Sequence, residues 1–276
     1  MRIAIVTDST CDIPIDLVER LDITVVPNIL IIDGESIQDD PSFYRQDFYT
    51  RLPTMSSLPT TATTSSGTYN AVYERLFRQG YEKIVSLHAA RSLSGIINAA
   101  SVAAQSFSER VLVIDSQQVS LGLGFQVLAA AEAATRGLEI ASISAKIGDV
   151  RRRLRLVAML DTLEYVRRSG RVSWARASLG SLLNLKPFIE LRDGNVYRIG
   201  ETRTRNKGIA RLLEMMESLG PLENLAILHT NAESEASQLV EIMRPRVATP
   251  PMLVHVTTVI GTHVGPNGLG FVSVTR

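Results

Sequence analysis

The chain has 276 residues, of which 45% are hydrophobic, so it can bury one large core or two moderate ones, and its length favours two domains. This composition excludes a disordered or fibrous protein. The 29 Lys and Arg residues balance the 28 Asp and Glu residues, and a net charge of +1 gives the whole chain no attraction for nucleic acid or an anionic membrane. Residues 151–211 differ from this average, because 15 basic and 5 acidic residues make them a candidate basic docking surface.

Cys11 is the only cysteine, which excludes an internal disulfide and a multi-thiolate metal site and fits a reducing compartment. The first apolar run stops at Val6 and an acid follows at Asp8, so it is not the core of a signal peptide. The longest uncharged stretches fall short of the roughly 18 residues of a membrane span. We therefore expect a cytoplasmic protein without an integral membrane segment.

The first half of the chain alternates short apolar runs with amphipathic stretches. Strands are expected at 2–6, 23–26, 29–32, 83–87 and 111–114, and helices at 14–21, 42–52, 67–79, 93–107 and 119–134. Such alternation predicts a parallel sheet covered on both faces.

The pattern changes after about residue 158, where we expect a second domain to begin. Strands are expected at 188–191, 196–199, 225–229, 252–256 and 271–275, and helices at 207–219 and 232–243. The predicted domains are therefore 1–158 and 159–276. The sequence contains no long Gly/Ser linker, so the two should pack closely.

The common catalytic signatures are absent from the sequence. It contains no phosphate-binding Gly-Lys-Ser/Thr loop, no Gly-x-Ser-x-Gly elbow and no His-Glu-x-x-His helix. The histidines, His88, His229, His255 and His263, lack the paired spacing of metal ligands, so we expect no metal.

Hydroxyl-rich loops follow or precede the expected elements of the first domain, at 7–10, 60–66, 92–95 and 115–116. In an open α/β sheet the carboxyl ends of the strands converge on the ligand site, and short hydroxyls at helix starts suit an oxyanion. The alternative is that these residues only cap helices. A glycine-rich segment at 261–270 surrounds His263 and predicts a tight loop with this histidine at its rim, although a lone histidine is more often structural.

Seven short motifs follow one another along the chain. They are Thr7-Asp8-Ser9-Thr10, Pro59-Thr60-Thr61, Leu93-Ser94-Gly95, Asp115-Ser116, Leu163-Glu164-Tyr165 with the basic run at 167–171, Leu185-Lys186-Pro187, and the loop at 263–270. The same motifs occur in the same order in the DegV family of bacterial fatty-acid-binding proteins, which the sequence resembles over essentially its whole length.

The resemblance implies an α/β fold of two domains. Residues 1–158 would form a three-layer α/β/α domain with a parallel sheet, and residues 159–276 an α+β domain with a mixed sheet that completes a buried tunnel. The tunnel would hold one long-chain fatty acid, whose carboxylate is presented to a separate fatty acid kinase that makes an acyl phosphate for phospholipid synthesis. The protein would thus be a carrier, not an enzyme, with the fatty acid as its ligand and no cofactor.

Matching the motifs by position, the resemblance implies that Thr61, Ser94 and His263 hold the carboxylate. Hydroxyl donors and an imidazole can satisfy a carboxylate beside an apolar tunnel. The supporting loop residues would be Asp8, Ser9, Thr10, Thr60, Gly95, Ser116, Thr262 and Gly265. The candidates for kinase docking are Arg167, Arg168, Arg171, Arg203 and Arg205, for which the alternative is a solvated surface.

The sequence departs from the family pattern in three places. Residues 62–65 read Ala-Thr-Thr-Ser instead of Ser-Gln-Pro-Ser, residues 89–92 read Ala-Ala-Arg-Ser where adjacent serines are usual, and Val264 and Asn267 replace Thr and Gly. These changes leave the acyl-chain preference and the kinase coupling open.

Two other functions compete with the carrier. One is an enzyme related to dihydroxyacetone kinases, in which a histidine engages a small carbonyl substrate in a polar pocket. The other is a nucleic-acid-binding module built on residues 151–211, but Tyr165, Trp174 and Tyr197 are too scattered to provide a stacking surface.

Overall fold

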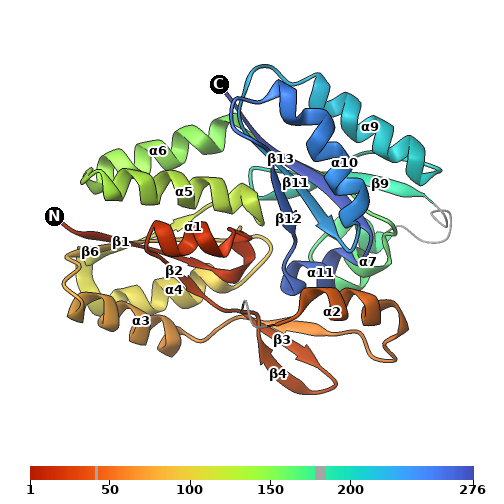
Figure 1. The fold of residues 1–276 in the computed structure, drawn as a ribbon. Coiled ribbons are helices and arrows are strands. Elements are labelled where there is room, and N and C mark those ends of the chain that lie inside the picture. Colours follow the sequence, from red (N-terminus) through yellow and green to blue (C-terminus); the bar gives the residue numbers. More distant parts are fainter. Residues whose placement is uncertain (41–42, 178–184) are drawn as a thin grey trace. The chain divides into compact units, whose positions relative to one another are not determined.

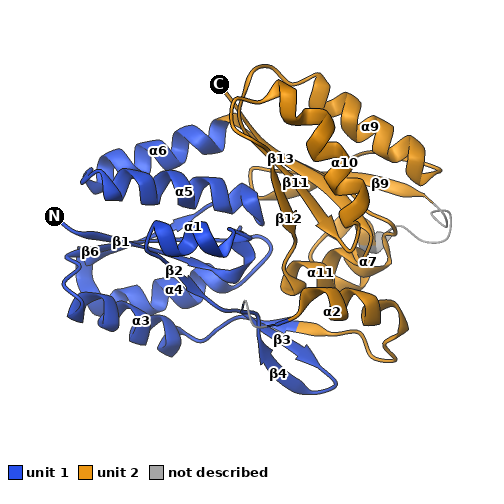
Figure 2. Cartoon of the chain, viewed as in Figure 1, with its two compact units in different colours: residues 1–43, 61–152 blue, residues 44–60, 153–276 orange. Residues whose placement is uncertain are grey.

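A computed structural model describes residues 1–40, 43–177 and 185–276 (Figure 1). The chain forms two compact units, one of residues 1–43 and 61–152 and the other of residues 44–60 and 153–276 (Figure 2). The sequence places the boundary at residue 158 and assigns 44–60 to the first domain. In the structure the units divide after Arg152, and residues 44–60 group with the second unit.

The first unit contains a four-stranded sheet in which every described pair of neighbouring strands is parallel. Its strands are β1 (Ile3–Asp8), β2 (Ile23–Val26), β6 (Lys83–His88) and β7 (Val111–Asp115), in the order β2-β1-β6-β7. All six residues of β1 are buried, as expected for a central parallel strand covered on both faces.

Helices cover both faces of this sheet. They are α1 (Ile15–Arg20), α3 (Ser66–Arg78), α4 (Ile96–Ala104), α5 (Leu121–Thr135) and α6 (Ile140–Arg153). The helices α3 and α4 lie on one face, and α5 with α6 beside it lies on the other (Figure 1). This arrangement is the three-layer α/β/α fold that the sequence predicts.

A small sheet in the order β4-β3-β5 follows, with strands β3 (Ile29–Ile32), β4 (Glu35–Gln38) and β5 (Thr60–Ala62). The antiparallel hairpin of β3 and β4 turns at Asp33 and Gly34, whose φ angles are 50° and 87°. Asp-Gly suits such a turn because both positions need positive φ. The sequence predicts β3 but not β4.

The second unit contains a six-stranded mixed sheet, which confirms the predicted fold class. Its strands are β8 (Leu154–Met159), β9 (Lys186–Arg192), β10 (Asn195–Thr202), β11 (Leu222–Thr230), β12 (Met252–His255) and β13 (Gly268–Thr275), in the order β10-β9-β8-β13-β11-β12. Among the described strand pairs of this sheet, β11 and β12 are parallel and the other neighbours are antiparallel.

The helices of the second unit are α2 (Arg45–Arg51), α7 (Glu164–Ser169), α8 (Ser173–Ala177), α9 (Arg205–Glu217), α10 (Glu233–Met243) and α11 (Thr258–Val264). The helix predicted over 42–52 begins at Arg45, and Ser42 lies outside the described residues. The short 3-10 helices of the two units are Ser9–Cys11, Leu52–Thr54, Gln105–Arg110 and Arg244–Arg246.

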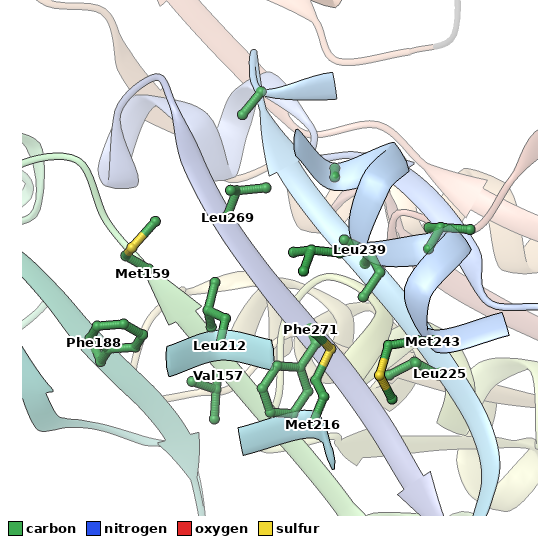
Figure 3. Close-up of a cluster of buried hydrophobic side chains, with 14 of the residues drawn as sticks. Val157, Met159, Phe188, Leu212, Met216, Leu225, Leu239, Met243, Leu269 and Phe271 are labelled. Carbon is green, nitrogen blue, oxygen red and sulfur yellow. The ribbon is translucent and has the colours of Figure 1, made fainter. Parts of the chain in front are cut away.

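The core of the second unit lies between one face of the sheet and the helices α9 and α10. Figure 3 shows Phe188, Phe271 and Met159 of the strands gathered with Leu212 of α9 and Leu239 of α10. Because side chains alternate along a strand, the next residues face the opposite way. On that opposite face, Ala158 and Ile189 pack with apolar side chains of α7 and α8.

Candidate functional site

The carboxylate of Asp8, at the end of β1, joins three loops of the first unit. Its Oδ1 accepts hydrogen bonds from Thr10 N (3.1 Å), Thr10 Oγ1 (2.5 Å) and Asn28 Nδ2 (3.2 Å), and its Oδ2 accepts from His88 Nδ1 (3.0 Å) and Ala89 N (3.2 Å). Burial by itself would raise the pKa of Asp8, but the contacts with His88, Thr10 and Ala89 hold it below the ordinary 3.8. Asp8 is therefore a charged anchor for the loops after β1, β2 and β6.

His88 continues this anchor into the interior of the unit. Its Nε2 lies 2.7 Å from Ser86 Oγ, which in turn lies 2.8 Å from Tyr73 Oη, and all three side chains are fully buried. Burial raises the pKa of Tyr73 to about 12, so its hydroxyl stays protonated. Donation from Tyr73 through Ser86 and His88 to Asp8 satisfies every group in the chain.

The order Asp8–His88–Ser86 is the order of a serine hydrolase triad, but the geometry does not suit that chemistry. Ser86 has no accessible surface and its oxygen is shared between His88 and Tyr73. A nucleophile must reach the reacting carbon of its substrate. The row of hydrogen bonds from Tyr73 to Asp8 instead gives this edge of the sheet a rigid polar support.

Two hydroxyls of the first loop, those of Ser9 and Thr10, have structural partners. The hydroxyl of Thr10 donates its hydrogen bond to Asp8. Ser9 Oγ accepts hydrogen bonds from Asn28 N at 3.1 Å and Asn28 Nδ2 at 3.3 Å, so its own O–H can still donate to a ligand. Ser116 is used in a similar way, because its Oγ donates to Gln118 O and accepts from Gln118 N, both at 3.1 Å. Of these three, Ser9 retains the most capacity to serve a ligand.

Thr61 and Ser94 lie in neighbouring segments of the first unit. Thr61 is half-buried in β5, and Ser94 is half-buried in the turn before α4, where its Oγ accepts the N–H of Ile96 at 3.4 Å. A Cβ placed on Gly95 would lie 3.5 Å from Thr63 Oγ1, so the residues that follow β5 run beside the loop with Ser94. Thr60, the neighbour of Thr61, is exposed.

His263 lies in the last turn of α11, in the second unit. Burial, with a smaller effect of the positive charge of Arg171, lowers the pKa of His263 from 6.5 to about 4. The imidazole is therefore neutral near pH 7 and can donate one N–H. Thr262 donates its hydroxyl to Thr258 O at 2.9 Å, so that group supports the helix.

The loop after α11 is held by Thr230 at the end of β11. Thr230 Oγ1 donates to Gly265 O at 2.8 Å and accepts from Gly268 N at 2.7 Å. Gly265 has a φ of 81°, a conformation that glycine adopts without strain. The sequence predicts a tight loop over 261–270 with His263 at its rim, but His263 lies in α11, and the fixed turn follows it at Gly265, before β13 begins at Gly268.

The five candidate docking arginines differ in their surroundings. Arg205 forms a two-point ion pair with Glu235 and also donates to Asn267 O at 2.7 Å, so it joins parts of the second unit. Arg168 pairs with Glu164, and Arg171 donates to Ser169 O at 2.7 Å. Arg167 and Arg203 are exposed. Residues 178–184 of the basic segment lie outside the described residues.

Asn28, Ser86, Tyr73 and Thr230 were not identified as site residues from the sequence. Ser86 and His88 are two residues apart at the end of a predicted strand, and such spacing places both on one face. This spacing was the signal in the sequence from which the buried hydrogen bond between Ser86 and His88 could have been predicted. Nothing local in the sequence indicates the roles of Asn28 and Thr230.

The described residues contain no group of three or more His, Cys, Asp and Glu side chains arranged to hold a metal ion. Across residues 1–40, 43–177 and 185–276, no helix is both long and apolar enough to cross a membrane.

The family model described as "Uncharacterised protein, DegV family" matches residues 2–276. The chain belongs to the DegV family. Among DegV relatives, a DegV domain-containing protein of Streptomyces coelicolor is 34% identical, with 100% of this chain and 99% of the relative aligned.

Two solved DegV structures resemble the protein over the full length of both chains. One, from Thermus thermophilus, is 31% identical with a TM-score of 0.92 and is described as a study of fatty acid binding by a DegV family protein. The other is DegV from Bacillus subtilis, described as a fatty acid binding protein, which is 30% identical with a TM-score of 0.89. These similarities cover both units, so they include the elements that carry Thr61, Ser94 and His263.

Proposed function

We propose that this DegV family protein binds one long-chain fatty acid in an apolar tunnel and holds its carboxylate with Thr61, Ser94 and His263. The observation that carries the proposal is the full-length similarity to the Thermus and Bacillus proteins, both described as binding fatty acids. Thr61 and Ser94 belong to the first unit and His263 to the second.

The chemistry of these side chains supports a carboxylate ligand. A carboxylate taken out of water needs a donor for its lone pairs, and two hydroxyls with a neutral imidazole can supply three. Because the pKa of His263 is about 4, it would bind the carboxylate by donating a hydrogen bond and not as a preformed cation. The Asp8 anchor would keep the loops after β1 and β6 in place before the ligand arrives.

Identification of the bound lipid tests the proposal directly. Each buried methylene contributes about 0.8 kcal/mol, so a long acyl chain should remain bound through purification. We expect native mass spectrometry to show about one fatty acid per chain and solvent extraction to release it. A ligand-free protein that also fails to take up added palmitate or oleate would overturn the proposal.

We further propose that the protein is a cytoplasmic carrier and not an enzyme, and that it presents the carboxylate to a separate fatty acid kinase. Transfer of a phosphoryl group from ATP to the carboxylate would then give an acyl phosphate for phospholipid synthesis. The inaccessible Ser86 argues against hydrolase chemistry, and a single buried cysteine, Cys11, suits a reducing compartment. Acyl phosphate formed by the loaded protein and ATP without a kinase would contradict the carrier role.

A further inference from the structure

Helix α11, which carries His263, is packed against two tyrosine rings. Figure 1 shows α2 and α7 next to α11, and each contributes one ring. A Cβ on Gly261 would lie 2.2 Å from Tyr49 Oη, and a Cβ on Gly265 would lie 2.3 Å from Tyr165 Cδ2. No side chain fits at either glycine unless a ring moves. His263 lies between these two contacts in the sequence.

Tyr49 also holds the start of α11. It is fully buried, and its hydroxyl lies 2.9 Å from Val256 O and 3.2 Å from Thr257 O, the two residues that precede the helix. Its ring stacks on His255 with a centroid distance of 5.1 Å. Tyr49 therefore contacts both the entry of α11 and a glycine in its middle.

The helix that carries Tyr49 is itself fixed to the second unit. Arg45 donates to His255 O, and Gln46 Nε2 lies 2.6 Å from Asn231 Oδ1. The residues that follow β11 and the end of β12 thus hold α2, and α2 in turn holds α11. Successive residues of a helix are rotated by about 100°, so Gly261 and His263 point to nearly opposite sides of α11. Tyr49 supports the helix from the side that His263 does not use.

We propose that Tyr49 is a positioning residue for His263: it sets the place of α11 and thereby the place of the imidazole. The inference rests on the proposed function only for the consequence that fatty-acid binding depends on Tyr49.

Two substitutions test the inference. Tyr49→Phe keeps the ring and removes the hydroxyl, whereas Gly261→Ala forces a methyl group against the ring. Matched controls are Tyr69→Phe, which alters a buried tyrosine whose hydroxyl has no partner within the described part of the structure, and Gly220→Ala, where an added Cβ meets nothing within 4 Å. Circular dichroism and thermal unfolding confirm that each variant is folded.

The first measurement is NMR titration of His263 in protein stripped of lipid, with the resonance assigned by His263→Gln. The wild-type imidazole should stay neutral from pH 7.5 to pH 5, since its pKa is about 4. In both test variants, release of α11 should expose the ring to water and move the pKa towards 6.5. The second measurement is the affinity for fatty acid. In both test variants it should fall by about 5-fold or more, as expected when one hydrogen bond to the ligand is lost.

The two readouts separate this inference from the proposed function. If the wild-type protein binds no fatty acid, the proposed function fails, but a changed His263 titration in the variants still supports the role of Tyr49. A wild-type titration in folded Tyr49→Phe, with or without a change in affinity, would overturn the inference. Tyr49→Phe decides the question if Gly261→Ala does not fold, because it adds no atom to the core.

Discussion

Asp8 and His88 join the carboxyl ends of two neighbouring parallel strands through a hydrogen bond of 3.0 Å between Oδ2 and Nδ1, with both side chains fully buried. The two residues are 80 positions apart in the sequence. A buried carboxylate is tolerated when donors surround it, and here five donors do so. The pair therefore fixes the edge of the sheet at which a ligand of this fold class is expected.

We expect Asp8→Asn to destabilise the first unit strongly. An amide supplies one acceptor oxygen and turns its NH₂ group towards donors, so several buried N–H and O–H groups lose their partner. Each such loss costs about 1–3 kcal/mol, which urea unfolding would detect. Tyr73→Phe is the control, because it removes only the far end of the chain and should cost about 1 kcal/mol. Equal stability of Asp8→Asn and wild type would show that Asp8 is not the anchor.

Ser94→Ala and His263→Ala should each weaken fatty-acid binding without unfolding the protein. Each removes one donor to a buried carboxylate, a loss of about 1–3 kcal/mol, or roughly 5- to 150-fold in affinity. Competition with a fluorescent fatty acid measures the change, and Ser218→Ala, at an exposed position of the second unit, is the control. Unchanged affinity in both variants would remove these residues from the site.

The stability of the protein should fall as the pH is lowered from about 6.5 to about 4. The pKa values of His255 and His263 are lowered from 6.5 to about 4, chiefly by burial, so in this window the unfolded chain binds protons that the folded chain does not. Stability rises with pH wherever the unfolded state holds more protons. The stabilisation from the two neutral histidines is therefore fully present above pH 6.5 and is lost as the pH falls towards 4. Urea unfolding across this range measures the slope, which His263→Gln should reduce. An unchanged slope in that variant would contradict a buried neutral His263.

The exposed arginines Arg167 and Arg203 should act in kinase docking, and Arg205 should act in folding. Replacing Arg167 and Arg203 by Glu should raise the apparent KM of the kinase for the loaded protein and leave fatty-acid affinity unchanged. The effect should shrink with added salt, since the screening length is about 8 Å at physiological ionic strength. Arg205→Gln instead breaks the pair with Glu235 and should lower the unfolding temperature. Equal phosphorylation rates at low salt for wild type and the double variant would show that Arg167 and Arg203 have no role in docking.

Several elements were not predicted, for different physical reasons. The helix α11 contains Thr258, Val259, Ile260 and Gly261, residue types with low helix propensity, so packing against Tyr49 and Tyr165 decides its conformation. The helix α6 was missed although Ile143, Ile147 and Val150 mark its buried face. The apolar spacing that predicts α6 is present in the sequence, but the basic run at 151–153, which is the last part of the helix, obscures where it ends.

The sequence by itself determined the class of the fold and the chemistry available to the site. Alternating apolar and amphipathic stretches specify a parallel sheet covered by helices, and the Asp193-Gly194 turn specifies the hairpin of β9 and β10, because these patterns act over a few residues. The hydroxyls and His263 were likewise visible as residue types, although the structure places Thr61 in β5 and His263 in α11 and not in loops.

Only the tertiary structure decided which of these groups form hydrogen bonds or pack against one another. Strand pairing brings His88 to Asp8, and the packing of residues 44–60 with the second unit brings Tyr49 to Gly261. Local propensity contains no information about such partners, because they are selected by the burial of whole faces and by the need to satisfy every buried polar group. For the same reason the sequence identified Thr10 and Ser116 as hydroxyls but could not show that their hydrogen bonds go to Asp8 and Gln118.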